Sequence, residues 1–321
     1  MRKTTVIFAL AACALAFAAA DGAATGPATL VVDRDGVQCA NADFTSIQAA
    51  VDAAQPGDLI RVCPDLYTES VVVDKPLTLK GDPDAIEAVD CFQPTPGELP
   101  VDQQAIVDPA GDGFSSGFKL EADDIELAGF VVQGASVGID AVDRFSGYRL
   151  HHNLIRLNTL FGVDFGSEGT GDSRVDHNCI RENRWGLVSE LDDDSLWAFP
   201  AVGDERGEWN ARDLHNARID HNSTFRNAAG VEAAGPGRHD NVVFDHNVSR
   251  EDQVGIALQN SRQSRIQDNG LRPARFGVLV GGATTGVEIA RNAVQTGEQG
   301  IVLSRQPRLS TSFRPRSPTR R

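Results

Sequence analysis

Acidic side chains occupy one position of a short pattern, Gly-apolar-x-apolar, that recurs along the chain. The x residue is acidic in three copies, which place Asp140, Asp164 and Glu232 there. If the copies stack as strands about 4.8 Å apart, the Asp140 and Asp164 carboxylates approach to about 5 Å, and Glu232 lies about 10 Å from Asp164. Glycosidases use carboxylate pairs about 5–9.5 Å apart as acid and base or nucleophile. We therefore predict that these three residues are catalytic.

The closeness of Asp140 and Asp164 has a second chemical reading. Two neighbouring carboxylates either repel, which raises one pKa, or share a cation, so Ca²⁺ is a candidate ligand of this face. The plainest alternative is that outward strand positions are polar because they face water. The protein would then be a non-catalytic surface or adhesion protein.

An acidic insertion of about twenty residues, roughly 190–216, directly follows the strand that ends near Val188. It contains Trp197 and Trp209, and we predict that these side chains wall a groove and stack on a sugar ring. The alternative is that the two rings form a small apolar cluster beneath a long loop.

A column of histidines offers different chemistry. His152, His177, His221 and His246 each precede an asparagine, and beside them run His151, Asp176, Asp220 and Asp245. Stacked imidazoles near carboxylates can bind a transition metal or titrate together near about pH 6. This reading makes the protein a periplasmic metal-binding module. The alternative is local hydrogen bonding at a repeated bend.

The asparagines themselves define the repeat that must position all of these groups. They are Asn153, Asn178, Asn222, Asn247, Asn269 and Asn292, and successive members lie 25, 44, 25, 22 and 23 residues apart. A glycine follows each after eight or nine residues. Repetition at this period is typical of stacked coils. A buried amide needs partners, so we predict that each asparagine bonds to the next coil and that together they form a ladder.

Short alternating runs surround each asparagine, as in Val287-Glu288-Ile289 and Gly255-Ile256-Ala257-Leu258. This period of two predicts strands with one buried face, and no unit carries a long apolar stripe at helical spacing. The pattern resembles the right-handed parallel β-helix repeats of the pectin-lyase-like superfamily. The resemblance implies an all-β fold, a right-handed parallel β-helix with three short strands per coil.

The resembled families include lyases, hydrolases, esterases, epimerases and proteins without catalysis, so the fold alone does not name a reaction. Their working surface is usually the outer face of one sheet, walled by loops. The resembled lyases commonly use a cationic base in β-elimination, and from Asp140 to Val302 we find no Lys or Arg at the outward positions. We therefore expect a polysaccharide hydrolase rather than a lyase, if the chain is an enzyme.

The N-terminal part reads as a signal peptide, residues 1–20, followed by a capping helix over Thr45–Ala54 with a Thr45–Gln48 capping box. Four cysteines remain after cleavage. Cys39 and Cys63 flank the helix, and we predict a disulfide between them. Cys179 falls at a position that can point inward, where we expect a free buried thiol.

Charge and composition set the remaining expectations. The chain carries −15, and removal of Arg2 and Lys3 with the signal makes the mature protein −17. An acidic surface disfavours nucleic acid and anionic lipid. We expect a secreted monomer without a membrane span, with one domain over residues 21–304 and a basic disordered tail over 305–321.

Overall fold

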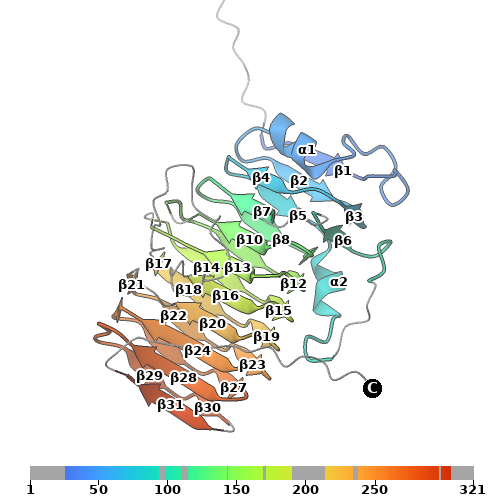
Figure 1. Ribbon diagram of the computed structural model, residues 1–321. Helices are drawn as coiled ribbons and strands as arrows, with labels where there is room; N and C mark the ends of the chain where they lie inside the picture. Colours follow the sequence, from blue (N-terminus) through green and yellow to red (C-terminus); the bar gives the residue numbers. More distant parts are fainter. Residues whose placement is uncertain are drawn as a thin grey trace, which may run out of the picture.

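The chain winds into a stack of coils whose strands form three long parallel sheets (Figure 1). A computed structural model describes residues 26–93, 99–109, 115–142, 144–168, 171–189, 214–233, 238–295 and 298–304. The predicted signal peptide, most of the insertion with Trp197 and Trp209, and the predicted tail lie outside these residues. No helix among the described residues combines the length and apolar character needed to cross a bilayer.

Each coil contributes one strand to each sheet in turn, and all strand pairs in the described residues are parallel. Sheet I consists of β1 (Thr29–Val32), β2 (Leu59–Val62), β5 (Thr78–Lys80), β8 (Glu126–Ala128), β11 (Arg149–His151), β14 (Ser173–Asp176), β18 (Ala217–Asp220), β22 (Val243–Asp245), β26 (Arg265–Gln267) and β29 (Glu288–Ala290). Sheet II consists of β3 (Asp65–Tyr67), β6 (Ala105–Val107), β9 (Phe130–Gln133), β12 (Leu154–Arg156), β15 (Cys179–Arg181), β19 (Ser223–Phe225), β23 (Val248–Arg250), β27 (Gly270–Arg272) and β30 (Ala293–Val294). Sheet III consists of β4 (Val71–Val73), β7 (Ser116–Leu120), β10 (Val137–Ala141), β13 (Phe161–Phe165), β16 (Trp185–Ser189), β20 (Ala229–Ala233), β24 (Val254–Gln259), β28 (Phe276–Gly281) and β31 (Gln299–Leu303).

The alternating pattern sends one face of each strand into a continuous apolar core. In β10, Ile139 and Ala141 are fully buried in that core while Asp140 between them is only partly buried. In β13, Val163 and Phe165 take the same inward places. The core therefore runs the length of the stack between the three sheets.

The predicted asparagine ladder forms at the corner between sheets I and II. The Oδ1 atom of Asn222 accepts from the backbone N and Nδ2 of Asn178 at 3.1 and 3.0 Å. Nδ2 of Asn222 donates to Asn247 Oδ1 at 3.1 Å, and the pattern continues to Asn292. At the start of the ladder, the backbone N of Phe130 donates to Asn153. Asn153 to Asn269 are all buried, so each rung satisfies amides that water does not reach.

The repeated glycines are needed for close backbone approach. A Cβ on Gly186 would lie 2.3 Å from the carbonyl oxygen of Gly230, in the next coil. Positive φ angles are found instead at the residues before the asparagines, including His177 at 55° and His221 at 56°. Close backbone approach, and not a positive φ angle, therefore requires glycine at this position.

A second ladder runs along the corner between sheets II and III. Asn158, Asn183 and Asn227 lie five residues after members of the first ladder, and Nδ2 of Asn158 donates to Asn183 Oδ1 at 3.0 Å. Asn183 bonds to Asn227 in the same way at 3.4 Å. The sequence analysis missed this ladder, although its constant offset of five residues from the first is visible in the sequence.

Asp252 takes the asparagine place at the end of the second ladder and is fully buried. One carboxylate oxygen accepts from the backbone N and Nδ2 of Asn227, at 2.8 and 2.9 Å. The other accepts from the hydroxyls of Thr224 and Ser249, at 2.6 and 2.7 Å. Burial raises the pKa of Asp252 to about 6, and these hydrogen bonds offset only part of that rise.

We expect this raised pKa to make the protein less stable as the pH rises. The stability linked to protonated Asp252 is fully present below the unfolded pKa of 3.8 and is lost as the pH passes through about 6. At about 1.4 kcal/mol per pH unit, the loss is on the order of 2–3 kcal/mol. Urea denaturation across this pH range measures it. Asp252→Asn keeps an acceptor for Asn227 and should remove this part of the pH dependence; parallel profiles for the two proteins would contradict the assignment.

The capping helix is α1 (Ile47–Ala53), which lies over the first coil against β1, β2 and β4 (Figure 1). Its N-cap is Ser46, so the predicted Thr45–Gln48 capping box is wrong. Glu69 instead accepts from the backbone N of Ile47 and of Gln48, at 2.8 and 3.0 Å. A carboxylate from the coil below therefore satisfies the free N–H groups of the helix.

The described residues contain two disulfides. Cys39–Cys63 forms as predicted. Cys91–Cys179 also forms, so the expectation of a free thiol at Cys179 is wrong. It ties the segment after α2 (Pro83–Glu87) to β15 of sheet II. Two disulfides fit an oxidising compartment outside the cytosol.

The three corners of the coil differ in length. Two residues connect sheets I and II in every coil from β11 to β30, and three or four connect sheets II and III from β12 to β28. The corner from sheet III back to sheet I varies most. Between β16 and β18 this corner spans residues 190–216, where the insertion was predicted. The same corner of three successive coils contributes one strand each to a small sheet of β17 (Leu214–His215), β21 (His239–Asp240) and β25 (Ser261–Arg262).

Candidate functional site

The three predicted carboxylates lie in one column on the outer face of sheet III. Asp140 pairs in register with Asp164, and Asp164 pairs with Val188. Val188 in turn pairs with Glu232, two coils beyond Asp164. The structure therefore brings Asp140 and Asp164 to neighbouring strands, about 4.8 Å apart along the stack.

These carboxylates are not simply solvated. Asp164 is 3% exposed and Glu232 6% exposed, although both sit at outward strand positions. Asp140 is partly buried. A solvent-covered polar face would leave such side chains open to water, so burial distinguishes this column from an ordinary polar surface.

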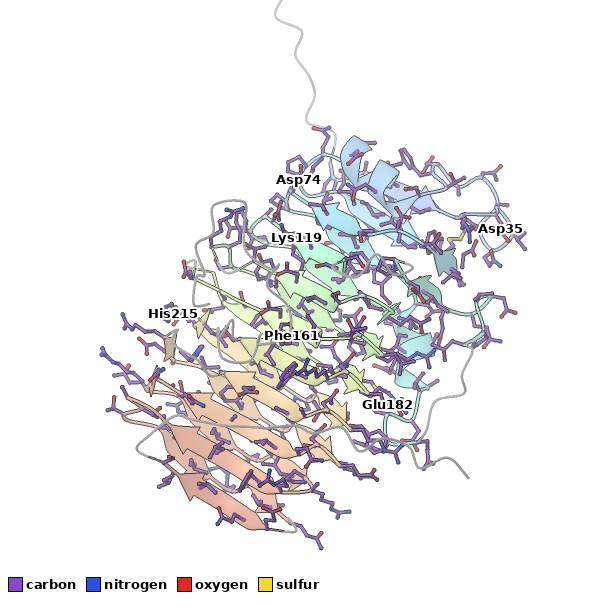
Figure 2. The ribbon with its side chains drawn as sticks, viewed as in Figure 1. Asp35, Asp74, Lys119, Phe161, Glu182 and His215 are labelled. Carbon is purple, nitrogen blue, oxygen red and sulfur yellow. A yellow bond between two sulfur atoms is a disulfide. The ribbon has the colours of Figure 1, made fainter. Side chains whose placement is uncertain are left out.

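A lysine precedes the carboxylates in the same column. Lys119 pairs in register with Asp140, and its Nζ lies 2.7 Å from Oε1 of Glu121 (Figure 2). The outward positions from Asp140 to Val302 hold no Lys or Arg, but the neighbouring strand β7 adds a cation to the same face. Gly117-Phe118-Lys119-Leu120 has the same Gly-apolar-x-apolar pattern, so the sequence carried the signal. The reason given for hydrolysis over elimination no longer holds.

Aromatic side chains lie on the same face, beside the acids. Phe161 and Trp185 pair in register on neighbouring strands, with ring centroids 5.5 Å apart (Figure 2). They pack with Val188 in a small apolar cluster outside the main core. The guanidinium of Arg184 lies 4.3 Å from the Trp185 ring centroid. The sequence analysis did not single out Trp185, although it directly precedes Gly186 of the repeat.

The outer face of sheet III thus changes character along the stack. Its N-terminal half carries Lys119, Asp140 and Asp164, and Glu232 follows after Val188. Beyond Glu232 the outward positions hold Ala257, Leu279 and Val302, which belong to a second apolar cluster that also contacts Trp185. Charged groups therefore adjoin an apolar, aromatic strip on one surface.

The histidine column is a regular stack on the corner of sheets I and II. Centroids of successive rings from His152 to His246 are 5.0, 5.0 and 4.8 Å apart, with interplanar angles of 5° or less. Nδ1 of His177 lies 2.8 Å from Asp176 Oδ2, and Nδ1 of His221 lies 2.8 Å from Asp220 Oδ2.

Each of these aspartates also lies within reach of arginine. Arg174 contacts Asp220 through Nη2 at 2.6 Å. Burial raises the pKa of Asp220, but the hydrogen bonds from Arg174 and His221 outweigh it and hold that pKa below its usual value. Arg174, Asp176 and Asp220 thus form a local network of ion pairs and hydrogen bonds beside the ring stack.

Metal binding by the histidines stays a prediction that this arrangement does not favour. One metal ion needs nitrogens that converge on it at about 2.0–2.1 Å, whereas parallel rings present theirs side by side. Among the described residues, every group of three metal-binding side chains with ligand atoms within 4.8 Å of one another contains Asp33, near the N-terminal cap.

No family model matches the chain, and no protein of curated function matches its sequence. Among solved structures, it is similar to an alginate lyase from Paenibacillus sp. str. FPU-7, with a TM-score of 0.51 and 13% identity over 87% of this chain and 99% of that chain. The chain is a right-handed parallel β-helix. The predicted right-handed parallel β-helix fold is thereby confirmed.

Two further likenesses are weaker. A GH136 lacto-N-biosidase from Eubacterium ramulus gives a TM-score of 0.41 and 11% identity, over 87% of this chain and 68% of that chain. Pectin methylesterase from carrot gives a TM-score of 0.32 and 11% identity, over 85% of this chain and 87% of that chain.

Proposed function

We propose that this β-helix binds a polysaccharide along the outer face of sheet III and hydrolyses it with a pair of carboxylates. The observation that carries the proposal is the burial of Asp164 and Glu232 at outward strand positions, beside the Phe161 and Trp185 rings. Aromatic rings provide an apolar platform for a sugar, and buried carboxylates are suited to proton transfer.

Two carboxylate pairs predict two different outcomes at the anomeric carbon. Asp140 and Asp164, on neighbouring strands, match the separation of about 5–5.5 Å in retaining enzymes. One would protonate the glycosidic oxygen and the other would attack the sugar, and water would then release the covalent intermediate. Asp164 and Glu232, two strands apart at about 9.6 Å, approach the wider separation of inverting enzymes. The anomeric configuration of the first product distinguishes the pairs.

A second reaction is favoured by one observation, the register of Lys119 with Asp140. A lysine beside a carboxylate on this face can act as the base of a β-elimination on a uronate chain. The acidic protein repels such a substrate unless a divalent cation intervenes, so we place elimination behind hydrolysis. Its product carries a double bond that absorbs ultraviolet light, and Lys119→Met would abolish that absorbance.

The experiment offers the purified chain a panel of neutral polysaccharides and polyuronates and measures reducing ends and ultraviolet absorbance. We expect Asp164→Asn to lower product release at least about a hundredfold, because one partner of either pair is lost. Glu251→Gln is the matched control, because Glu251 is an exposed carboxylate at the corner between sheets II and III. Binding without product identifies a non-catalytic carbohydrate-binding protein, and unchanged turnover in Asp164→Asn contradicts the site.

The wider organisation belongs to the same proposal. Residues 1–20 direct export and are removed, residues 21–304 form one domain, and residues 305–321 form a basic tail. Trp197 and Trp209 remain candidates for stacking on a sugar ring, since the insertion that contains them directly follows β16 in the sequence. Export is supported by the two disulfides.

A further inference from the structure

Three carboxylates meet beside the N-terminal cap, far along the stack from the Glu232 end of the sheet III column. Asp33 directly follows β1, Asp35 comes two residues later, and Asp65 begins β3. One carboxylate oxygen from each lies within 4.8 Å of the other two. Gly36 follows with a φ of +72°, which turns the chain tightly after Asp35.

The negative charge of this cluster is not balanced by protein groups. Asp33 is 1% exposed, yet its Oδ1 has no hydrogen-bond partner, and the same holds for the buried Oδ2 of Asp65. Among the described residues, no Lys, Arg or His forms an ion pair with any of the three carboxylates. The neighbouring Arg34 instead donates from Nη1 to the carbonyl oxygen of Leu66 at 2.8 Å.

Such an arrangement is unfavourable without a further ligand. A buried carboxylate oxygen that accepts no hydrogen bond loses its hydration without replacement, and like charges at this distance repel. A cation held between the three carboxylates would satisfy the orphaned oxygens and remove the repulsion at once. The three carboxylates therefore form a converging set of oxygen ligands that suits a cation.

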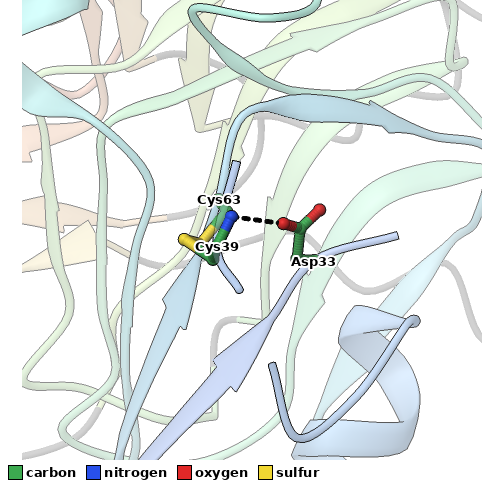
Figure 3. A group of neighbouring side chains, drawn as sticks. All are labelled: Asp33, Cys39 and Cys63. Atoms are coloured by element: carbon green, nitrogen blue, oxygen red, sulfur yellow. Dashed lines mark hydrogen bonds between the residues drawn. A yellow bond between two sulfur atoms is a disulfide. The ribbon is translucent and has the colours of Figure 1, made fainter. Parts of the chain in front are cut away.

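Covalent and hydrogen-bonded links hold the cluster together from both sides. The Cys39–Cys63 disulfide ties the loop after β1 to the segment just before Asp65, and the backbone N of Cys39 donates to Asp33 Oδ2 (Figure 3). The hydroxyl of Tyr67 donates to the carbonyl oxygen of Cys63 at 2.8 Å. Because both sulfurs are oxidised, they are not metal ligands, and only oxygen donors remain.

We propose that Asp33, Asp35 and Asp65 bind a Ca²⁺ ion. Ca²⁺ takes six to eight oxygen ligands at about 2.3–2.6 Å, so ligands on opposite sides of the ion lie up to about 5 Å apart, as these carboxylates do. Mg²⁺ demands a smaller octahedron with bonds of about 2.0–2.1 Å, and Zn²⁺ prefers nitrogen and sulfur. Water and backbone carbonyls complete the shell.

The amide of Gln38 links two parts of the cluster. Its nitrogen donates to Asp35 Oδ1 at 3.0 Å and to the carbonyl oxygen of Pro64, next to Asp65, at 3.3 Å. This site is separate from the sheet III column and does not depend on the proposed function.

The test titrates CaCl₂ into the full chain after removal of divalent ions, followed by calorimetry and thermal unfolding. We expect a dissociation constant on the order of 10⁻⁴ M, in the range of extracellular calcium modules. CaCl₂ at about 10 mM, near a hundredfold excess over this constant, should then raise the melting temperature by about 5 °C. The same concentration of MgCl₂ should raise it much less.

Substitutions of the aspartates distinguish Ca²⁺ binding by these side chains from a purely structural role. Asp35→Asn changes an exposed side chain and should abolish the Ca²⁺ response without loss of fold. Asp65→Asn should do the same and, in chelator, should melt no lower than the parent protein because repulsion is relieved. Asp74→Asn, at an exposed carboxylate outside the cluster, is the control that should keep the full response. Absence of Ca²⁺ binding by the parent chain overturns the proposal, as does an undiminished response in Asp35→Asn and Asp65→Asn.

Discussion

Replacement of Asn222 by alanine is expected to lower the free energy of unfolding by about 4 kcal/mol, a large share of the 5–15 kcal/mol typical of a domain. Asn222 is 0% exposed at the middle of the first ladder. Its Oδ1 accepts two hydrogen bonds from Asn178. Its Nδ2 donates to the carbonyl oxygen of Val175 at 2.8 Å and to Asn247.

The size of this effect follows from the partners left behind. Alanine would remove the acceptor of the Asn178 backbone N and the side-chain donor to the Val175 carbonyl oxygen in a buried site, at about 1–3 kcal/mol for each unsatisfied group. Nδ2 of Asn178 would keep its hydrogen bonds to the Leu150 and Asp176 carbonyl oxygens. Urea denaturation followed by circular dichroism measures the loss. Asn292→Ala, at the half-buried end of the ladder, is the matched control and should cost about 1 kcal/mol because water can reach the freed groups. Equal losses in the two variants would show that the ladder does not hold the coils.

Removal of the Cys91–Cys179 disulfide in a double alanine variant should also destabilise the protein strongly. The bridge closes a loop with a sequence separation of 88 residues, against 24 for Cys39–Cys63. Loop-closure entropy gives about 4–5 kcal/mol for the longer loop and about 3 kcal/mol for the shorter one. Thermal unfolding of both double variants should therefore rank the longer bridge first.

The longer bridge also secures the packing around a buried charge. The segment next to Cys91 places the Phe92 ring 6.1 Å from that of Phe225, and the guanidinium of Arg250 lies 4.0 Å from the Phe92 ring centroid. The buried charge is Arg181, whose guanidinium lies 5.5 Å from the Phe225 ring centroid and which is 0% exposed. Loss of the bridge should open this cover, so proteolysis of the 82–93 segment should accelerate. A variant without Cys39 and Cys63 is the control, and a larger loss there would contradict the ranking.

The scaffold was predictable because its causes are local and repeated. Alternation of apolar residues fixes which face of each strand is buried, and the constant place of Asn178 or Asn222 in each unit fixes the stacking. The second ladder escaped notice although Asn183 and Asn227 repeat just as regularly.

What the sequence did not predict depends on contacts between distant segments. The partner of Cys179 lies in an irregular passage whose path is set by packing of Phe92, not by any period. Lys119 belongs to a unit that precedes the first asparagine, so it fell outside the aligned column. The alternation placed Asp164 on the outer face but could not tell that it is buried there, since burial depends on what covers the sheet.

The unequal corners of the coil have an evolutionary consequence. From β11 onward, two corners keep lengths of two and of three or four residues beside the ladders, whereas the corner after sheet III absorbs the large changes in chain length. Selection can therefore lengthen, shorten or recharge the rim beside Asp164 and Trp185 without unstacking a single coil. Homologous chains can therefore differ in the ligand that this rim binds while they keep the same stack of coils.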